Sequence, residues 1–332
     1  MMNVYGWAKV CIRPYLLLLL LAGCGETSSR IRAQEIHIQR FDKDMFRFLE
    51  TGDSLAVLSL TETYPVMMDI TGKALFNLPS AGAPDFLQKL MAYYGDSTLR
   101  ELYRVSLQRF DDVTEIEQQL SPALAFLSDT LGGLPVPQLY MHVSGFSQNI
   151  LAGEGTLSLS IDKYLGEHPL YNEFFYGYQR KLMQPEFIVR DYLMGWLMSE
   201  FPFTGRDNVL LDRMIYEGKI HYLVRKALPD SSIAHILGYT ADEYRQILHQ
   251  ETLIWHALLD RKHLYRPDYP TTQSYFDPRP ATFLSDSLPG NLGACLGLHI
   301  VARYVSRTHT TPSALLRHTD AQEILRLSRY NP

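Results

Sequence analysis

The sequence has little cysteine: Cys11, Cys24 and Cys295 are the only three among 332 residues. There is no Cys-x-x-Cys pair and no cluster of histidines at metal-ligand spacing, so nothing indicates a zinc ribbon or zinc finger. Internal repeats, a Gly-rich phosphate loop, a dinucleotide fingerprint and a Gly-x-Ser-x-Gly elbow are also missing. These absences argue against a repeat protein, the common nucleotide-binding folds and an α/β-hydrolase.

Charge of either sign is spread thinly along the chain. The 31 basic and 36 acidic residues give a net charge of −5 and form no long run, which predicts no nucleic-acid partner and no basic membrane-binding face. With 46% hydrophobic and 20% charged residues, the chain can bury a large core. We therefore expect a globular protein, with residues 35–332 as a single domain.

The amino terminus has the pattern of a bacterial lipoprotein signal. Lys9 and Arg13 precede an apolar run, which ends in the lipobox Leu21-Ala22-Gly23-Cys24. Residues 1–23 are predicted to be a signal peptide, with a lipid on Cys24 and a polar tether at 24–34. The lipid would hold the chain on the inner or outer membrane of the cell envelope, with the domain facing the periplasm. The alternative is an ordinary secretory signal with a chance cysteine.

Cys295 would then be the one thiol left to the folded domain, so no disulfide can form within the mature chain. It lies in an apolar helix-like run without a basic environment. We expect a small core residue and no nucleophile.

Apolar periodicity predicts an α+β fold that is predominantly α-helical. Helices are expected at 43–50, 55–64, 86–94, 99–110 and 113–131, and again at 185–201, 207–224, 241–263, 291–305 and 320–327. Alternating apolar residues predict strands at 136–143, 149–153 and 156–161, as a small antiparallel sheet. The proline-rich segment 264–289 is too long for a simple connector and is expected to cover the surface or line a groove.

The helix pair between 185 and 224 carries charges on its apolar faces. Helical spacing places Arg190, Asp191 and Met194 inward on the first helix, and Glu217 and His221 inward on the second. Unpaired charges are strongly disfavoured in a core. These residues must therefore be paired or functional.

Their spacing resembles that of a gluzincin peptidase, in which His-Glu-x-x-His is followed by a glutamate from the next helix. Arg190 and Met194 occupy the histidine positions, Asp191 the general-base position and Glu217 the last ligand position. Arginine cannot bind zinc and a thioether binds it poorly, so we expect no metal. We predict instead an ion pair between Arg190 and Glu217. The alternative keeps a zinc ion on Asp191, Glu217 and His221, with Asp191 and Glu217 as catalytic candidates.

The Glu217 and His221 pair has a simpler interpretation as a hydrogen-bonded core pair, because residues four apart often contact each other on a helix. A second feature is an aromatic run formed by Tyr171, Phe174, Phe175, Tyr176 and Tyr178. Such a run usually packs a loop on a core, and a glycan-binding groove is the other interpretation.

Taken in order, these landmarks resemble the gliding-motility lipoprotein family GldB of Bacteroidetes-type bacteria. Besides the lipobox, the matching segments include 38–42 with Asp42, 162–166 with Asp162, Tyr164 and Gly166, 215–219 with Gly218, 289–293 with Gly290, and the closing 328–332. Together they cover nearly the whole mature chain.

The resemblance implies a distant similarity to predicted zinc-dependent peptidases, with Glu217-Gly218 retained and both histidines lost. It implies a zincin-like scaffold without the metal motif: a pseudo-enzyme, with no cofactor, that binds or assembles with a protein partner in the envelope. The alternative function is a divergent metal-dependent peptidase in the periplasm.

Overall fold

The computed structural model describes residues 35–52, 54–285 and 288–332. These described residues form one compact unit. The predicted signal peptide, Cys24 and the tether lie outside the described residues. Within the described residues, no helix is both long and apolar enough to cross a membrane.

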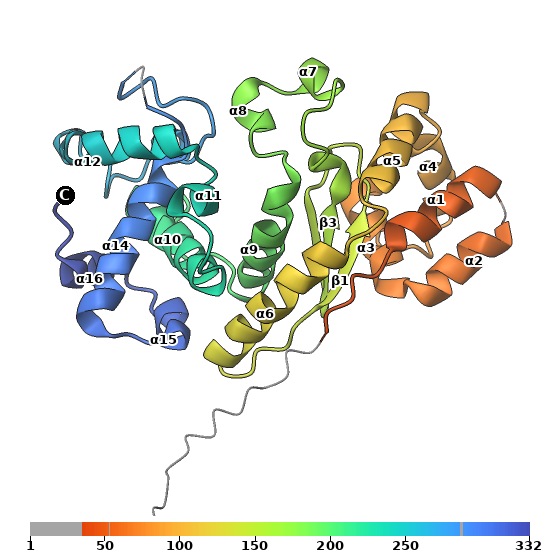
Figure 1. Cartoon of the computed structure of the whole chain (residues 1–332), viewed down its shortest axis with the longest axis horizontal. Helices are drawn as coiled ribbons and strands as arrows, with labels where there is room; N and C mark the ends of the chain where they lie inside the picture. Colours follow the sequence, from red (N-terminus) through yellow and green to blue (C-terminus); the bar gives the residue numbers. More distant parts are fainter. Residues whose placement is uncertain (1–34, 53, 286–287) are drawn as a thin grey trace, which may run out of the picture. The chain divides into compact units, whose positions relative to one another are not determined.

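Helices make up most of the chain before the sheet (Figure 1). They are α1 (Phe41–Thr51), α2 (Ser54–Thr63), α3 (Pro65–Phe76), α4 (Phe86–Tyr93), α5 (Ser97–Arg109) and α6 (Thr114–Thr130). Local chemistry sets several of their ends: Asp96 accepts a hydrogen bond from the backbone N–H of Leu99 and begins α5, and Pro65 is the first residue of α3. Helix α3 was not predicted from the sequence.

The sheet consists of β1 (Gln138–His142), β2 (Ile150–Gly153) and β3 (Thr156–Ser160), in the order β1-β3-β2. Strands β2 and β3 form the expected antiparallel hairpin, but β1 pairs with β3 in parallel. The expectation of an antiparallel sheet was therefore wrong. The loop at 143–149 carries the chain past the position of β3, so the hairpin folds back and inserts β3 beside β1.

The remaining helices follow the sheet. They are η1 (Ile161–Lys163), α7 (Tyr171–Phe174), α8 (Gly177–Arg180), η2 (Pro185–Phe187), α9 (Ile188–Glu200), α10 (Leu210–Ala227), α11 (Ile233–Leu237), α12 (Ala241–Asp260), α13 (Tyr269–Ser274), α14 (Leu292–Thr308), α15 (Pro312–Arg317) and α16 (Ala321–Ser328). The predicted α9 and α10 pair is confirmed. Helix α12 begins at a capping box in which Thr240 and Glu243 bond each other's backbone N–H groups.

Two buried apolar clusters meet along α10. Its first half contributes Leu211 and Met214 to a cluster with α12, α14 and α16, and its second half contributes Leu223 and Val224 to a cluster with the sheet and α9. Helix α10 also packs closely on α14 (Figure 1). Because α10 belongs to both clusters, it fixes the position of α9 relative to the carboxy-terminal helices.

Candidate functional site

A pocket of about 420 Å³ lies between α9, α10 and the segment that leads into α14. All five residues that the sequence analysis singled out on the helix pair line it: Arg190, Asp191, Met194, Glu217 and His221. The predicted convergence of the two helix faces is thus present. The segment at 264–289 supplies Gln273, Phe276 and Pro278 to the same pocket, as one of its two predicted placements required.

Arg190 is 8% exposed and forms its ion pair with its sequence neighbour, Asp191. Its Nη2 lies 2.7 Å from Asp191 Oδ1, and its Nε donates to the same oxygen at 2.7 Å. The other carboxylate oxygen accepts a hydrogen bond from the hydroxyl of Tyr164 at 2.6 Å. Burial and the negative charge of Asp191 raise the pKa of Tyr164 well above its usual value, so this hydroxyl stays protonated and continues to donate.

Glu217 pairs with Arg213, one turn earlier on α10, at 3.1 Å. No ion pair between the described residues joins Arg190 to Glu217, so that prediction was wrong. The physical reason is proximity, because each acid has an arginine within its own helix at contact distance. Burial raises the pKa of Glu217, while the positive charge of Arg213 acts against that rise.

His221 is 4% exposed, and its Nδ1 lies 2.8 Å from the backbone carbonyl of Glu217. A carbonyl only accepts, so Nδ1 carries the proton and Nε2 is left with a free lone pair. Burial lowers the pKa of His221 to about 4, so the ring is neutral at pH 7. Glu217 and His221 do form a core hydrogen bond, but through the backbone of Glu217 and not through its carboxylate.

These residues do not fit a zinc ion. Asp191 and Glu217 are each engaged by an arginine, and Met194 offers only a thioether. Across the described ranges, no three side chains of the types His, Cys, Asp and Glu are grouped to hold a metal.

The pocket continues into a second one of about 320 Å³. The two share Leu182, Arg190, Asp191 and Pro278, and we call their union the central groove. The second pocket adds Asn149, Lys163 and Tyr164. Burial lowers the pKa of Lys163, and the nearby Asp162 partly offsets this effect.

Asp162, a residue of the family-like segments, is fully buried behind the groove. Its carboxylate accepts hydrogen bonds from the backbone N–H of Phe146 at 2.8 Å, the backbone N–H of Ser144 at 3.3 Å and the hydroxyl of Ser160. Burial raises its pKa. These bonds fix the start of the segment that carries Tyr164, and Gly166 ends that segment at φ +80°, where a side chain would be strained.

The aromatic run divides between packing and exposure. Tyr171 is buried and its hydroxyl donates to the backbone carbonyl of Asp162 at 2.5 Å, and Phe175 packs on the ring of Phe146. Phe174 and Tyr176 are exposed, and the ring of Tyr176 stacks on that of Tyr178 with a centroid distance of 5.6 Å. Tyr171 and Phe175 are thus packing residues.

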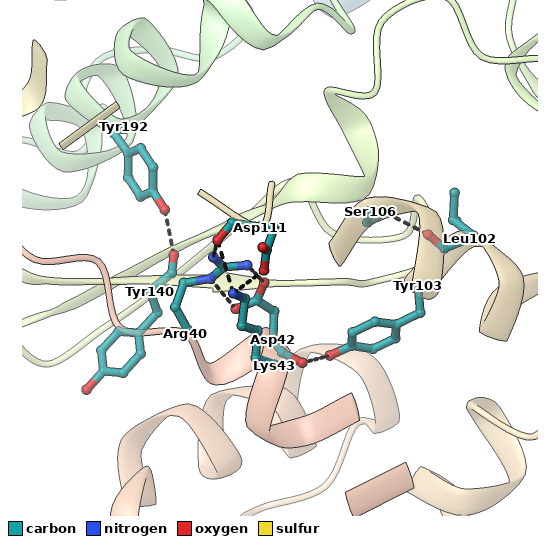
Figure 2. A network of polar contacts seen from close by, with 9 residues as sticks. All are labelled: Arg40, Asp42, Lys43, Leu102, Tyr103, Ser106, Asp111, Tyr140 and Tyr192. Carbon is teal, nitrogen blue, oxygen red and sulfur yellow. Dashed lines mark hydrogen bonds and ion pairs between the residues drawn. The ribbon is translucent and has the colours of Figure 1, made fainter. Parts of the chain in front are cut away.

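Asp42 does not line the groove and belongs to the polar network of Figure 2. Its buried carboxylate pairs with Arg40 at 2.7 Å, and its backbone carbonyl accepts from the hydroxyl of Tyr103 at 2.9 Å. Lys43 and Arg40 both donate to the carbonyl of Asp111. This network attaches the start of α1 to α5 and to the residues that follow it, which is a structural role.

Gly218 and Gly290 are positions of close approach. A side chain on Gly218 would overlap the backbone of Gly297 in α14, and one on Gly290 would overlap the carbonyl oxygens of Asp277 and Arg279. Both glycines therefore set how closely backbone segments pack around the groove.

Some groove residues were not predicted from the sequence. Arg213 could have been found from its spacing of four residues to Glu217, whereas Gln273 follows from no pattern in the sequence. Asn291 is the residue before α14, with φ +57°, and its side chain makes no capping hydrogen bond. A Pro-Gly-Asn sequence before a helix was the available signal for it.

These features define a mainly helical α+β protein with a polar groove, whose first pocket has its charges paired internally. The chain belongs to the family described as gliding motility protein GldB, whose model matches residues 25–332. This confirms the family resemblance and makes the protein a gliding-motility lipoprotein associated with the cell envelope. No curated protein and no solved structure matches the chain, and nothing found supports a similarity to zinc peptidases.

Proposed function

We propose that this protein is a non-catalytic binding or assembly component, held in the envelope by a lipid on Cys24 after removal of residues 1–23. Its domain faces the periplasm, and its central groove receives a protein partner of the envelope. One observation carries this proposal: both carboxylates of the first pocket, Asp191 and Glu217, are engaged by arginines of their own helices. Paired in this way, they are suited to a polar wall and poorly suited to metal binding or proton transfer. A zincin-like origin of the helix pair remains a prediction.

A complementation experiment tests the proposal. The gene is deleted in its own bacterium, and variants are judged by colony spreading and by protein level in the membrane fraction. Glu217→Gln keeps the shape of the groove and removes the negative charge of this side chain, so we expect the variant to restore spreading. Met194→Trp, which fills the groove, should not restore it. Leu253→Trp is the matched control, because Leu253 is 68% exposed on α12.

A Glu217→Gln protein that is present at the normal level but inactive would contradict the non-catalytic role. Zinc content of the full-length protein gives a second readout. Stoichiometric zinc in the wild type that disappears in Glu217→Gln would contradict the proposal and favour the peptidase alternative.

A further inference from the structure

Three neutral polar groups of the central groove have no partner among the described residues. The side-chain amides of Gln273 and Asn291 both line the first pocket, and neither makes a hydrogen bond to a described residue. His221, 4% exposed, lines it too, and its Nε2 is likewise without a hydrogen-bond partner in the described chain. Buried polar groups normally have partners, so a nine-tenths buried imidazole with a free lone pair at a pocket indicates a ligand that donates a hydrogen bond.

The charged groups of the same pocket are already balanced. Besides the pairs Arg190 with Asp191 and Arg213 with Glu217, Lys181 pairs with Glu243 at 2.7 Å. A charged ligand would have to break one of these partly buried pairs, and leaving a buried charge without its partner is costly. In the first pocket the groups open to a ligand are therefore neutral, whereas Lys163 of the second pocket has no ion-pair partner among the described residues.

The groove also spans two adjoining pockets and is partly apolar. Its two pockets join at Leu182 and Pro278, and Met194 and Phe276 add apolar surface to the first. A side-chain amide presents one donor group beside one acceptor, which matches the alternating N–H and C=O groups of an extended backbone. A compact ligand would use one pocket only, whereas an extended chain uses both.

We infer that the central groove binds an extended stretch of polypeptide through its backbone, with uncharged residues of that stretch in the first pocket. A backbone N–H donates to His221 Nε2, and the amides of Gln273 and Asn291 bond neighbouring backbone groups. Apolar side chains of the bound segment rest on Met194 and Phe276. This inference rests on the proposed function and specifies the chemistry of the partner.

The test uses the full-length lipoprotein, purified in detergent, and a library of short linear peptides without Lys, Arg, Asp or Glu. Peptides that bind are measured by fluorescence anisotropy against the wild type, Gln273→Met and Asn291→Gly. Glycine tolerates the positive φ of Asn291, and methionine keeps the length of the Gln273 side chain. We expect each variant to weaken binding about five- to tenfold, the effect of one lost hydrogen bond. The control is Gln246→Met on the exposed face of α12, which should bind as the wild type does.

A second measurement identifies the backbone as the recognised group. Methylating single backbone nitrogens of a bound peptide removes one N–H at a time and keeps every side chain. We expect a loss of at least tenfold at one or two positions. If no peptide binds, or if both variants bind as tightly as the wild type, the inference is wrong, although complementation could still show a partner-binding role. Binding of neutral oligosaccharides in place of peptides, weakened by the same two variants, would overturn the peptide assignment.

Discussion

The guanidinium of Arg190 contacts the carboxylate of Asp191, its neighbour in α9, at 2.7 Å. The second oxygen of that carboxylate is held by Tyr164, from the segment that follows the sheet. One carboxylate therefore connects α9 to the segment after β3 and to a buried arginine. The wall of the groove depends on this connection.

Tyr164→Phe removes only the hydroxyl that donates to Asp191. Hydrogen bonds to charged groups contribute about 1.5–3 kcal/mol, so we expect the free energy of unfolding to fall by about 2 kcal/mol. Urea denaturation measures the change. The control is Tyr265→Phe, because Tyr265 is 49% exposed and should contribute almost nothing. Equal losses in both variants would show that the hydroxyl of Tyr164 has no special role.

Gly218→Ala tests the contact between α10 and α14. The added methyl group would overlap the backbone of Gly297, which cannot move without displacing the helix. Overpacking costs about 1–3 kcal/mol when side chains can adjust, and we expect about 3 kcal/mol or more here because the obstacle is backbone. Gly177→Ala is the control, since its nearest neighbour is the end of the Arg180 side chain at 3.8 Å. Thermal unfolding of the two proteins should separate clearly, and a normal midpoint for Gly218→Ala would contradict the close approach.

The network of Figure 2 predicts unequal effects for two aspartates. Asp42→Asn leaves Arg40, whose side chain is 17% exposed, without its buried counter-charge and should cost about 3 kcal/mol. Asp111→Asn removes a carboxylate whose side chain is 81% exposed, and should change stability by less than about 0.5 kcal/mol. Chemical denaturation at neutral pH gives both numbers. A cost for Asp111→Asn as large as that for Asp42→Asn would assign the stability to the exposed pair.

Much of this fold could be predicted from the sequence, because most of its helices show their apolar face as a period of three and four residues. The helix pair at the groove is the clearest case. The parallel pairing of β1 with β3 could not be predicted, since strand order depends on where the loop at 143–149 passes. The alternation of apolar residues within a strand does not identify the strand with which it pairs.

The main charged residues of the candidate site were predicted from the sequence, but the ion pairs between them were not. Helical spacing indicated correctly that Arg190 and Glu217 lie at the same pocket. It carries no information on which acid forms an ion pair with which arginine. Arg213 provides the nearer partner for Glu217, and Asp191 the nearer partner for Arg190. Gln273 entered the site through α13, which carries no strong periodic signal. Tertiary packing decided these pairings.

The carboxylate of Glu251 predicts how stability depends on pH. It is buried enough for desolvation to favour its neutral form, yet hydrogen bonds from His299 and Tyr330, both at 2.5 Å, outweigh this effect and lower its pKa below the usual 4.5. A group whose pKa is lower in the folded state stabilises the fold above its unfolded pKa, and this stabilisation is lost as the pH falls through the folded pKa. Tyr330 follows α16, so the same carboxylate also attaches the segment after α16 to α12 and α14.

Glu251→Gln should therefore destabilise the protein more at pH 7 than in acid. We expect the difference in the free energy of unfolding between variant and wild type to be largest at neutral pH and to shrink as the pH falls below about 4.5. Denaturant titrations of both proteins across this range provide the measurement. Glu323→Gln is the control, because its carboxylate is 44% exposed and contributes little to stability at either pH. A difference that stays constant from neutral to acid pH would mean that the ionised carboxylate of Glu251 does not stabilise the fold.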